Sequence, residues 1–264
     1  MTSTPTPPPV LVEREPGLII ARMNRPQALN SLSPDLRDML EAVIAEAEAD
    51  PQVRALLLTG VGRAFCAGGD VSGMGTRERS FEQIVENMGE AHRWLKRLRL
   101  AHTIVVSAVN GVAAGGGFGL ALLGDVIVAS EAAYFKSAFT ALGAAADFGL
   151  GWTLPRAVGQ VRAREILFSE RRIEAAEALA IGLVGRVFPA ETFEAETLAI
   201  ARQIARGPLS MGLSKRLLNH EDAASLDGYF AAEARAQAQA FLSADFREGV
   251  SAFREKRPAT FSMR

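Results

Sequence analysis

The fold is decided by Thr103–Leu120, which reads TIVVSAVNGVAAGGGFGL. The apolar run Thr103–Val109 predicts a strand buried on both faces, and Gly115–Leu123 predicts a helix entered through glycines. Ala55–Thr59 (ALLLT) with Gly62–Asp70 (GRAFCAGGD) repeats this order of a buried strand and a glycine-rich segment. Ligands bind beyond the carboxyl ends of strands in α/β sheets, so both glycine-rich segments are expected at a ligand site.

Working outward, strands and helices alternate, which indicates an α/β fold with right-handed crossovers and a largely parallel sheet. Ser33-Pro34-Asp35 has the hydroxyl cap, early proline and early acid that start a helix. From about residue 173 the pattern is mostly helical. The other expected strands are Val10–Glu13, Leu18–Met23 and Asp125–Ser130, and the other expected helices are Ser80–Arg99, Ala175–Ala180, Ala190–Arg206 and Leu226–Leu242.

The composition is that of an ordinary globular chain of 264 residues with a net charge of −1. This charge gives no reason to expect nucleic acid or an acidic membrane as a partner. The single cysteine, Cys66, excludes an internal disulfide and a cysteine-cluster metal site. No apolar stretch approaches the ~20 residues that span a bilayer. Residues 1–9 contain a proline-rich run without the features of a secretory signal. We expect a disordered tail there and a cytoplasmic protein.

Three explanations compete for the two glycine-rich segments. The first is tight strand-to-helix packing, which glycine permits. The second is phosphate binding, but neither segment matches G-x-x-x-x-G-K-[ST] or G-x-G-x-x-G. The third is a pair of backbone N–H donors for a developing oxyanion, which requires no side chains. Because two such segments each follow a strand of their own, the third explanation is favoured.

GRAFCAGGD and NGVAAGGGFGL resemble the two oxyanion-hole segments of the enoyl-CoA hydratase/isomerase (crotonase) family. The resemblance runs from about Val10 to Arg264, with further matches at NRPQALN (24–30), LPRAVG (154–159) and EGVSAFREKR (248–257). It implies a crotonase-like spiral of ββα units over residues 10–200. It also implies a C-terminal helical oligomerisation region over residues 201–264, which would form a homotrimer or a dimer of trimers.

The same resemblance implies the binding residues. Gly69 and Gly116 would donate their N–H groups to the thioester oxygen of an acyl-CoA, in which coenzyme A is part of the substrate. No separate cofactor and no metal are expected. Contacts to coenzyme A are implied for Arg25, Ala28, Ala67, Gly68, Phe253 and Lys256. Where the family often has a lysine this chain has Gln27, so that phosphate contact is either missing or supplied by Arg25.

The acid/base residues of hydratases are missing. By the resemblance, their two glutamates would fall at Gly119 and Phe139. Asp147, in GAAADFG, instead resembles the catalytic aspartate of the family's single-aspartate isomerases, such as the ring-1,2-epoxyphenylacetyl-CoA isomerases. Its apolar surroundings would raise its pKa and make it a better base. The alternative is a structural role as a helix N-cap or turn residue. We expect Asp70 to cap the next helix and Asp125 to be structural.

These observations predict an acyl-CoA isomerase that uses an oxyanion hole and one aspartate. It would convert a 3-enoyl-CoA to a 2-enoyl-CoA or isomerise a ring epoxide. Two alternatives stay open: an enoyl-CoA hydratase (a lyase) with a non-standard acid/base, and a non-catalytic acyl-CoA-binding protein. Turnover of an enoyl-CoA separates the enzymes from the binding protein.

Overall fold

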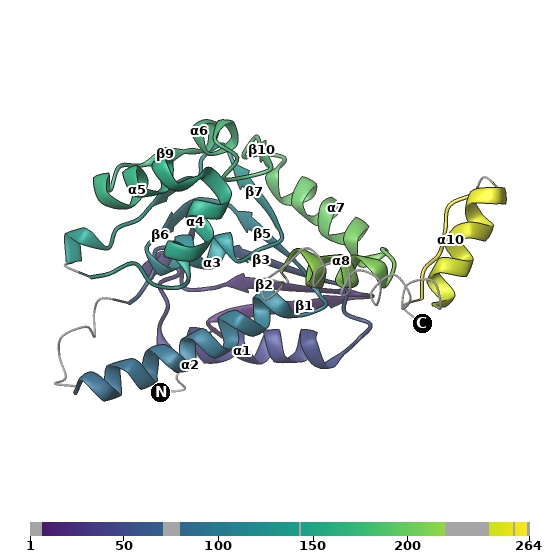
Figure 1. Cartoon of the computed structure of the whole chain (residues 1–264), viewed down its shortest axis with the longest axis horizontal. Coiled ribbons are helices and arrows are strands. Elements are labelled where there is room, and N and C mark those ends of the chain that lie inside the picture. The colour runs from purple at the N-terminus through teal and green to yellow at the C-terminus, as the bar shows by residue number, and fades with distance from the viewer. Residues whose placement is uncertain (1–6, 71–79, 143, 220–242, 256, 263–264) are drawn as a thin grey trace, which may run out of the picture.

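Six strands form the larger of two sheets in the computed structural model, which describes residues 7–70, 80–142, 144–219, 243–255 and 257–262 (Figure 1). The order is β1–β2–β3–β5–β7–β10, and neighbours are parallel except β1 and β2. The strands are β1 (Val10–Glu15), β2 (Leu18–Met23), β3 (Ala55–Gly60), β5 (Ile104–Val109), β7 (Val126–Ser130) and β10 (Arg186–Phe188). Helices of the described residues pack on both faces of this sheet.

The smaller sheet has the order β4–β6–β8–β9, with β9 antiparallel to β8. Its strands are β4 (Ala64–Cys66), β6 (Val112–Ala114), β8 (Tyr134–Lys136) and β9 (Ile173–Glu174). Consecutive strands β3 and β4, β5 and β6, and β7 and β8 divide between the two sheets, and a helix follows each pair. The expected α/β spiral of ββα units is therefore confirmed.

The large sheet buries both faces. Leu56 and Leu58 of β3 share one core with residues of α1 (Pro34–Ala49) and α2 (Phe81–Leu100), which lie beside each other in Figure 1. Leu57 belongs to a second core with α7 (Phe193–Ala205) on the opposite face. Successive side chains of a strand point to opposite faces, so a wholly apolar strand is expected to be covered on both sides.

Capping residues fix the starts of the first two long helices. The Ser33 hydroxyl accepts a hydrogen bond from the N–H of Leu36, and proline follows it. Ser80 and Gln83 form a reciprocal capping box at the start of α2. The sequence signals at Ser33 and Ser80 therefore predicted both helix starts to within one residue.

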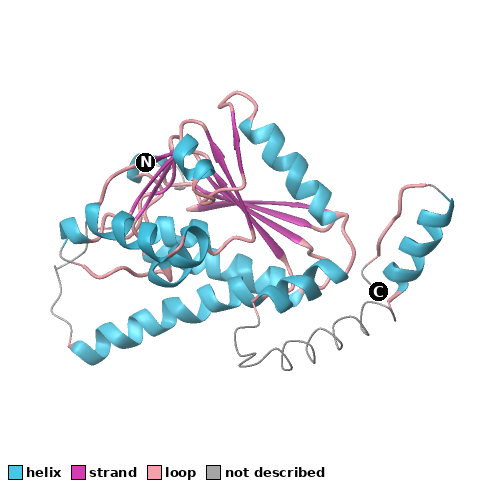
Figure 2. Cartoon of the chain, turned by 45° about the horizontal axis from the view of Figure 1, so that its top comes forward, coloured by secondary structure: helices cyan, strands magenta, loops and turns pink. Residues whose placement is uncertain are grey.

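After α3 (Gly116–Leu122) and α4 (Leu150–Val158), the chain continues through α5 (Gln160–Ser169), α6 (Ala175–Ala180), α7, α8 (Ser210–Leu218) and α10 (Ala244–Glu255). The α10 helix stands apart from the sheets (Figures 1 and 2). It is joined to the start of α8 by a hydrogen bond from the N–H of Leu209 to Asp245, 3.0 Å. The boundary expected near residue 200 falls inside α7, and the helix expected over 226–242 lies outside the described residues.

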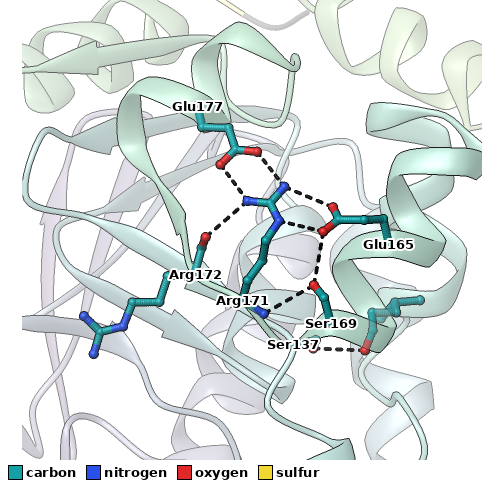
Figure 3. A network of polar contacts seen from close by, with 7 residues as sticks. Ser137, Glu165, Ser169, Arg171, Arg172 and Glu177 are labelled. Atoms are coloured by element: carbon teal, nitrogen blue, oxygen red, sulfur yellow. Dashed lines mark hydrogen bonds and ion pairs between the residues drawn. The ribbon is translucent and has the colours of Figure 1, made fainter.

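Arg171 ties α5 to α6 (Figure 3). Its guanidinium contacts Glu165 at 2.7 Å and Glu177 at 2.6 Å, and the hydrogen bonds from Arg171, helped by its charge, lower the pKa of both carboxyls. The Ser137 hydroxyl, just after β8, donates to the carbonyl of Leu167 in α5. These contacts hold α5 and α6 together at the edge of the smaller sheet, where α5 also packs against α4.

Several features differ from the sequence expectations. The three-residue strands β4 and β6 lie inside the segments expected to be glycine loops, and β8, β9 and β10 were not expected. Asn24 donates to the carbonyl oxygens of Pro8 and Pro9, which are therefore held in place although we expect them in the disordered tail. No helix of the described residues is long and apolar enough to cross a membrane.

Candidate active site

The two glycine-rich segments lie against each other. A β-carbon on Gly68 would stand 2.8 Å from the carbonyl oxygen of Ala114 and 3.2 Å from the nitrogen of Gly116. One on Gly117 would stand 2.1 Å from the carbonyl oxygen of Cys66. Real β-carbons do not come so close to backbone atoms, so only glycine fits at these two positions. Tight packing and ligand access therefore both contribute to the glycine content.

The N–H groups of Gly69 and Gly116 are available to a ligand. Gly116 is the first residue of α3, where an N–H has no partner within the helix. The carbonyl of Gly68 accepts a hydrogen bond from the N–H of Leu32, 2.8 Å, in an isolated parallel bridge between Leu32 and Gly69. Within the described ranges, neither glycine N–H donates a hydrogen bond to the protein. Two such donors on adjacent segments can stabilise an oxyanion.

Asp147 lies next to this pair of donors. Its Oδ1 is 3.4 Å from the point that a β-carbon on Gly116 would occupy. That oxygen is buried, with no hydrogen-bond partner among the described residues. Desolvation raises the pKa of Asp147, and the nearby charge of His92 partly opposes this effect. A hydrogen bond from the backbone N–H of Asp147 also lowers the pKa. A partly desolvated carboxylate with one oxygen that no described residue contacts has the properties of a general base.

The structural interpretation of Asp147 as a helix cap does not hold. The capping residue of α4 is Gly149, and no side chain hydrogen-bonds to the helix start. Phe148, directly after Asp147, has φ of 49° and Gly149 has φ of 71°. A left-handed conformation is strained for an aromatic residue and persists only where packing enforces it. Here Phe148 packs edge-on against Trp94, with ring centroids 6.0 Å apart, which fixes the turn that carries Asp147.

Of the two positions implied for hydratase glutamates, one is closed to any side chain and the other holds a phenylalanine. A β-carbon on Gly119 would stand 2.5 Å from the carbonyl oxygen of Phe148, so no side chain fits there. Phe139 is buried, and its ring edge is 3.9 Å from the place of a β-carbon on Gly115. Among the described residues, Asp147 is a carboxylate that lies beside the Gly116 donor, and no local sequence signal indicated that Phe148 fills the Gly119 position.

The residues implied for coenzyme A fall into two groups. The N–H of Ala67 donates to the carbonyl of Leu29, 3.0 Å, which joins the segment of Arg25 and Ala28 to that of Ala67 and Gly68. The Arg25 guanidinium contacts Asp70 at 2.9 Å and the Ser31 carbonyl at 2.7 Å.

Asp70 therefore pairs with Arg25, whereas α2 is capped by Ser80, contrary to our expectation for Asp70. In α10 the side chain of Phe253 is not described, and Lys256 lies outside the described residues.

Two further residues considered from the sequence, Asp125 and Cys66, have no catalytic features. Asp125 is paired with Lys215 at 2.8 Å, as a structural residue would be. Burial raises the pKa of the Cys66 thiol to about 12, so it is a thiol and a poor nucleophile at neutral pH. Among the described residues no three His, Cys, Asp or Glu side chains are grouped to hold a metal ion.

The spiral of ββα units with two interlocked glycine segments defines the crotonase fold. The solved structure of an enoyl-CoA hydratase from Bacillus anthracis superposes with a TM-score of 0.89 at 30% identity, covering 96% of this chain and 98% of that one. A family model described as enoyl-CoA hydratase/isomerase matches residues 13–264. The chain belongs to the enoyl-CoA hydratase/isomerase family, whose members act on acyl-CoA thioesters.

Relatives with different activities match at similar identity. The 1,2-epoxyphenylacetyl-CoA isomerase of Escherichia coli is 36% identical over 267 residues, which cover 96% of this chain and 98% of the relative. The short-chain-enoyl-CoA hydratase of Clostridium acetobutylicum is 34% identical over 250 residues, which cover 94% of this chain and 95% of the relative. Overall similarity therefore establishes the family, and the residues of the site must decide the reaction.

Proposed function

We propose that this chain is an acyl-CoA isomerase in which one carboxylate, Asp147, moves the proton. Two observations support this most. Asp147 Oδ1 lies beside Gly116 without a hydrogen-bond partner in the described part of the chain, and the Gly119 position has no room for a side chain. Hydration requires a water that is positioned and activated as well as a proton donor. Double-bond migration requires only one group that takes a proton and returns it.

The proposed reaction begins when the N–H groups of Gly69 and Gly116 donate to the thioester oxygen and acidify the α-carbon. The Asp147 carboxylate removes an α-proton from a 3-enoyl-CoA, which leaves a dienolate whose negative charge rests on that oxygen. The protonated Asp147 then gives the proton to the γ-carbon, and the product is the conjugated 2-enoyl-CoA. No proton or electron is gained or lost overall.

A ring-epoxide CoA thioester is the second candidate substrate, because the isomerase from Escherichia coli is named for such a compound. The same two donors and the same aspartate would serve. The hydratase alternative draws support from relatives named as hydratases, and it would need an acid/base other than a residue at Gly119.

Turnover of a 3-enoyl-CoA and of crotonyl-CoA tests the proposal, with wild type beside Asp147→Ala and Asp147→Asn. We expect isomerisation in the wild type, a loss of about 10²- to 10⁴-fold in both variants, and negligible hydration. Hydration that persists in both variants would overturn the single-aspartate mechanism. If neither compound reacts, a ring-epoxide thioester is the next substrate. Acyl-CoA binding without turnover of any of the three would favour the non-catalytic alternative.

A further inference from the structure

A cavity of about 610 Å³ opens beside the candidate active site. Phe148 and Gly149, which directly follow Asp147, form one end of its wall. Leu95 and Trp152 add apolar surface, so the part next to the site suits methylene groups or a ring. The cavity is therefore placed to receive the acyl part of a thioester whose carbonyl lies at Gly69 and Gly116.

Basic side chains from two helices line this cavity. His92, Lys96 and Arg99 line it from one face of α2, at spacings of four and three residues. Arg216 lines it from α8, a helix more than a hundred residues later in the chain. With a rise of 1.5 Å per residue, Arg99 lies roughly 10 Å along α2 from His92, the residue whose charge acts on Asp147.

The cavity cations differ from the other cations of the same helix. On α2, Arg93 pairs with Glu90 at 3.6 Å and Arg97 with Glu48 at 2.7 Å. Throughout the described part of the chain, by contrast, no carboxylate forms an ion pair with the three cations that line the cavity, namely Lys96, Arg99 and Arg216.

Arg99 has, in addition, a side-chain donor that makes no hydrogen bond to the described residues. Its Nε is buried and has no hydrogen-bond partner among the described residues. The guanidinium lies over the ring of Trp152, 5.8 Å from the centroid, which holds it at the cavity wall. Asp125, whose carboxylate interacts electrostatically with Arg99, is already paired with Lys215. A guanidinium fixed in this way is suited to a planar, doubly hydrogen-bonded anion.

We propose that the acyl group of the substrate carries a carboxylate at the end far from the thioester, and that Arg99 and Arg216 bind it. This inference rests on the proposed function, since it places the thioester carbonyl at the glycine donors. The apolar wall of Leu95 and Trp152 contacts the carbon atoms in between. Lys96 adds to the positive field at the mouth of the cavity.

The test compares two saturated thioesters of equal chain length, suberyl-CoA and octanoyl-CoA, by isothermal titration calorimetry. Suberyl-CoA ends in a carboxylate where octanoyl-CoA ends in a methyl group, and neither has a double bond to move. We expect the wild-type protein to bind suberyl-CoA about 10- to 100-fold more tightly, as charge-assisted hydrogen bonds imply. Equal or weaker binding of suberyl-CoA would overturn the inference.

Variants connect this preference to the cavity. Arg216→Gln, at an exposed position, and Arg99→Gln are each expected to bring the ratio of dissociation constants close to one. Arg99→Lys, which keeps the charge, should retain part of it. The matched control is Arg93→Gln, on the outer face of α2, which should leave the ratio unchanged. A preference that survives both Gln variants would place the carboxylate elsewhere. Because no turnover is involved, a failed Asp147 mechanism would leave this result intact.

Discussion

Asp147 and Gly116 share one small space: the aspartate Oδ1 is 3.4 Å from where a β-carbon of that glycine would be. The absence of a side chain on Gly116 therefore brings a carboxylate next to a main-chain N–H. The pair combines a base with a donor for the negative charge that the base creates. This combination, more than either residue alone, supports an enolate reaction at this place.

Asp147→Asn should remove activity and increase stability. Burial raises the pKa of Asp147, so its charged form is less favourable in the folded than in the unfolded chain. This cost is fully present above the folded-state pKa and disappears as the pH falls through it. We expect the variant to be more stable at neutral pH, by an amount that solvent screening of the partly exposed side chain reduces. Urea unfolding at pH 7 and pH 3 measures it.

At pH 3 the stability difference between Asp147→Asn and the wild type should be close to zero, because both side chains are then neutral. A variant less stable than the wild type at pH 7 would indicate that Asp147 has a structural role.

The pH dependence of kcat/KM should report the same carboxyl. The rate is expected to rise with pH through a pKa above the ordinary aspartate value of about 3.9, since Asp147 must lose its proton before it can act. The charge of His92 lowers that pKa, so His92→Gln should move the acidic limb to higher pH. The control is Arg93→Gln, one residue along the helix. An unchanged limb in His92→Gln would show that another group titrates.

Gly119→Ala should destabilise the fold, because its β-carbon would stand 2.5 Å from the Phe148 carbonyl oxygen. Overpacking of this kind costs about 1–3 kcal/mol. Gly89→Ala is the control, since a β-carbon there meets nothing within 4 Å in the middle of α2, and it should gain about 0.5–1 kcal/mol. Thermal unfolding of the two variants gives the comparison.

The same geometry predicts that Gly119→Glu will not create a hydratase. The new carboxylate could enter only by displacing Phe148 and, with it, Asp147. Robust hydration of crotonyl-CoA by this variant would contradict that prediction.

Lys215→Met should be strongly destabilising. The Lys215 ammonium is buried, donates to the carbonyls of Leu98 and Thr103, and pairs with Asp125 at 2.8 Å. Desolvation lowers its pKa and raises that of Asp125 despite their mutual attraction. Breaking a buried pair from one side typically costs about 3–5 kcal/mol. Chemical denaturation measures this loss, and the double variant with Asp125→Asn should recover part of it.

The oligomeric state implied by the family resemblance is a trimer or a pair of trimers. Sedimentation equilibrium should give three or six times the chain mass of 28.2 kDa. A monomer at micromolar concentration would contradict the prediction and would leave α10 without the neighbouring subunit that we expect it to contact.

Local signals were sufficient for much of the fold. Ser33 and Ser80 predicted two helix starts, and the apolar runs predicted β3 and β5. The short strands β4 and β6 were missed because three residues of alanine, valine, phenylalanine or cysteine carry no visible alternation. These strands pair because successive ββα units stack on one another, and their own residues carry no signal of it.

The candidate site was predictable in part. Motif resemblance pointed to Gly69, Gly116 and Asp147, and the structure brings these three residues together. The filling of the Gly119 position by Phe148 depends on a left-handed turn that no local signal announces. The position of Arg99 and Arg216 in the lining of one cavity could not be foreseen, because their helices are far apart in the chain. The spacing of His92, Lys96 and Arg99 on one face of α2 was a visible but unused signal.

The contact of Gly117 with the Cys66 carbonyl has a consequence for protein engineering. In a random mutational library of this chain, two kinds of position should differ in how well they tolerate substitution. At the interlocked glycines almost every replacement should abolish folding, so the charge-stabilising main chain is inherited intact by every folded variant. The side chains of the cavity, at His92 and Arg216, can be exchanged without disturbing these glycines, provided that Asp147 is kept as the proposed base. New substrate preferences should therefore be selectable from this scaffold while the proposed proton transfer is retained.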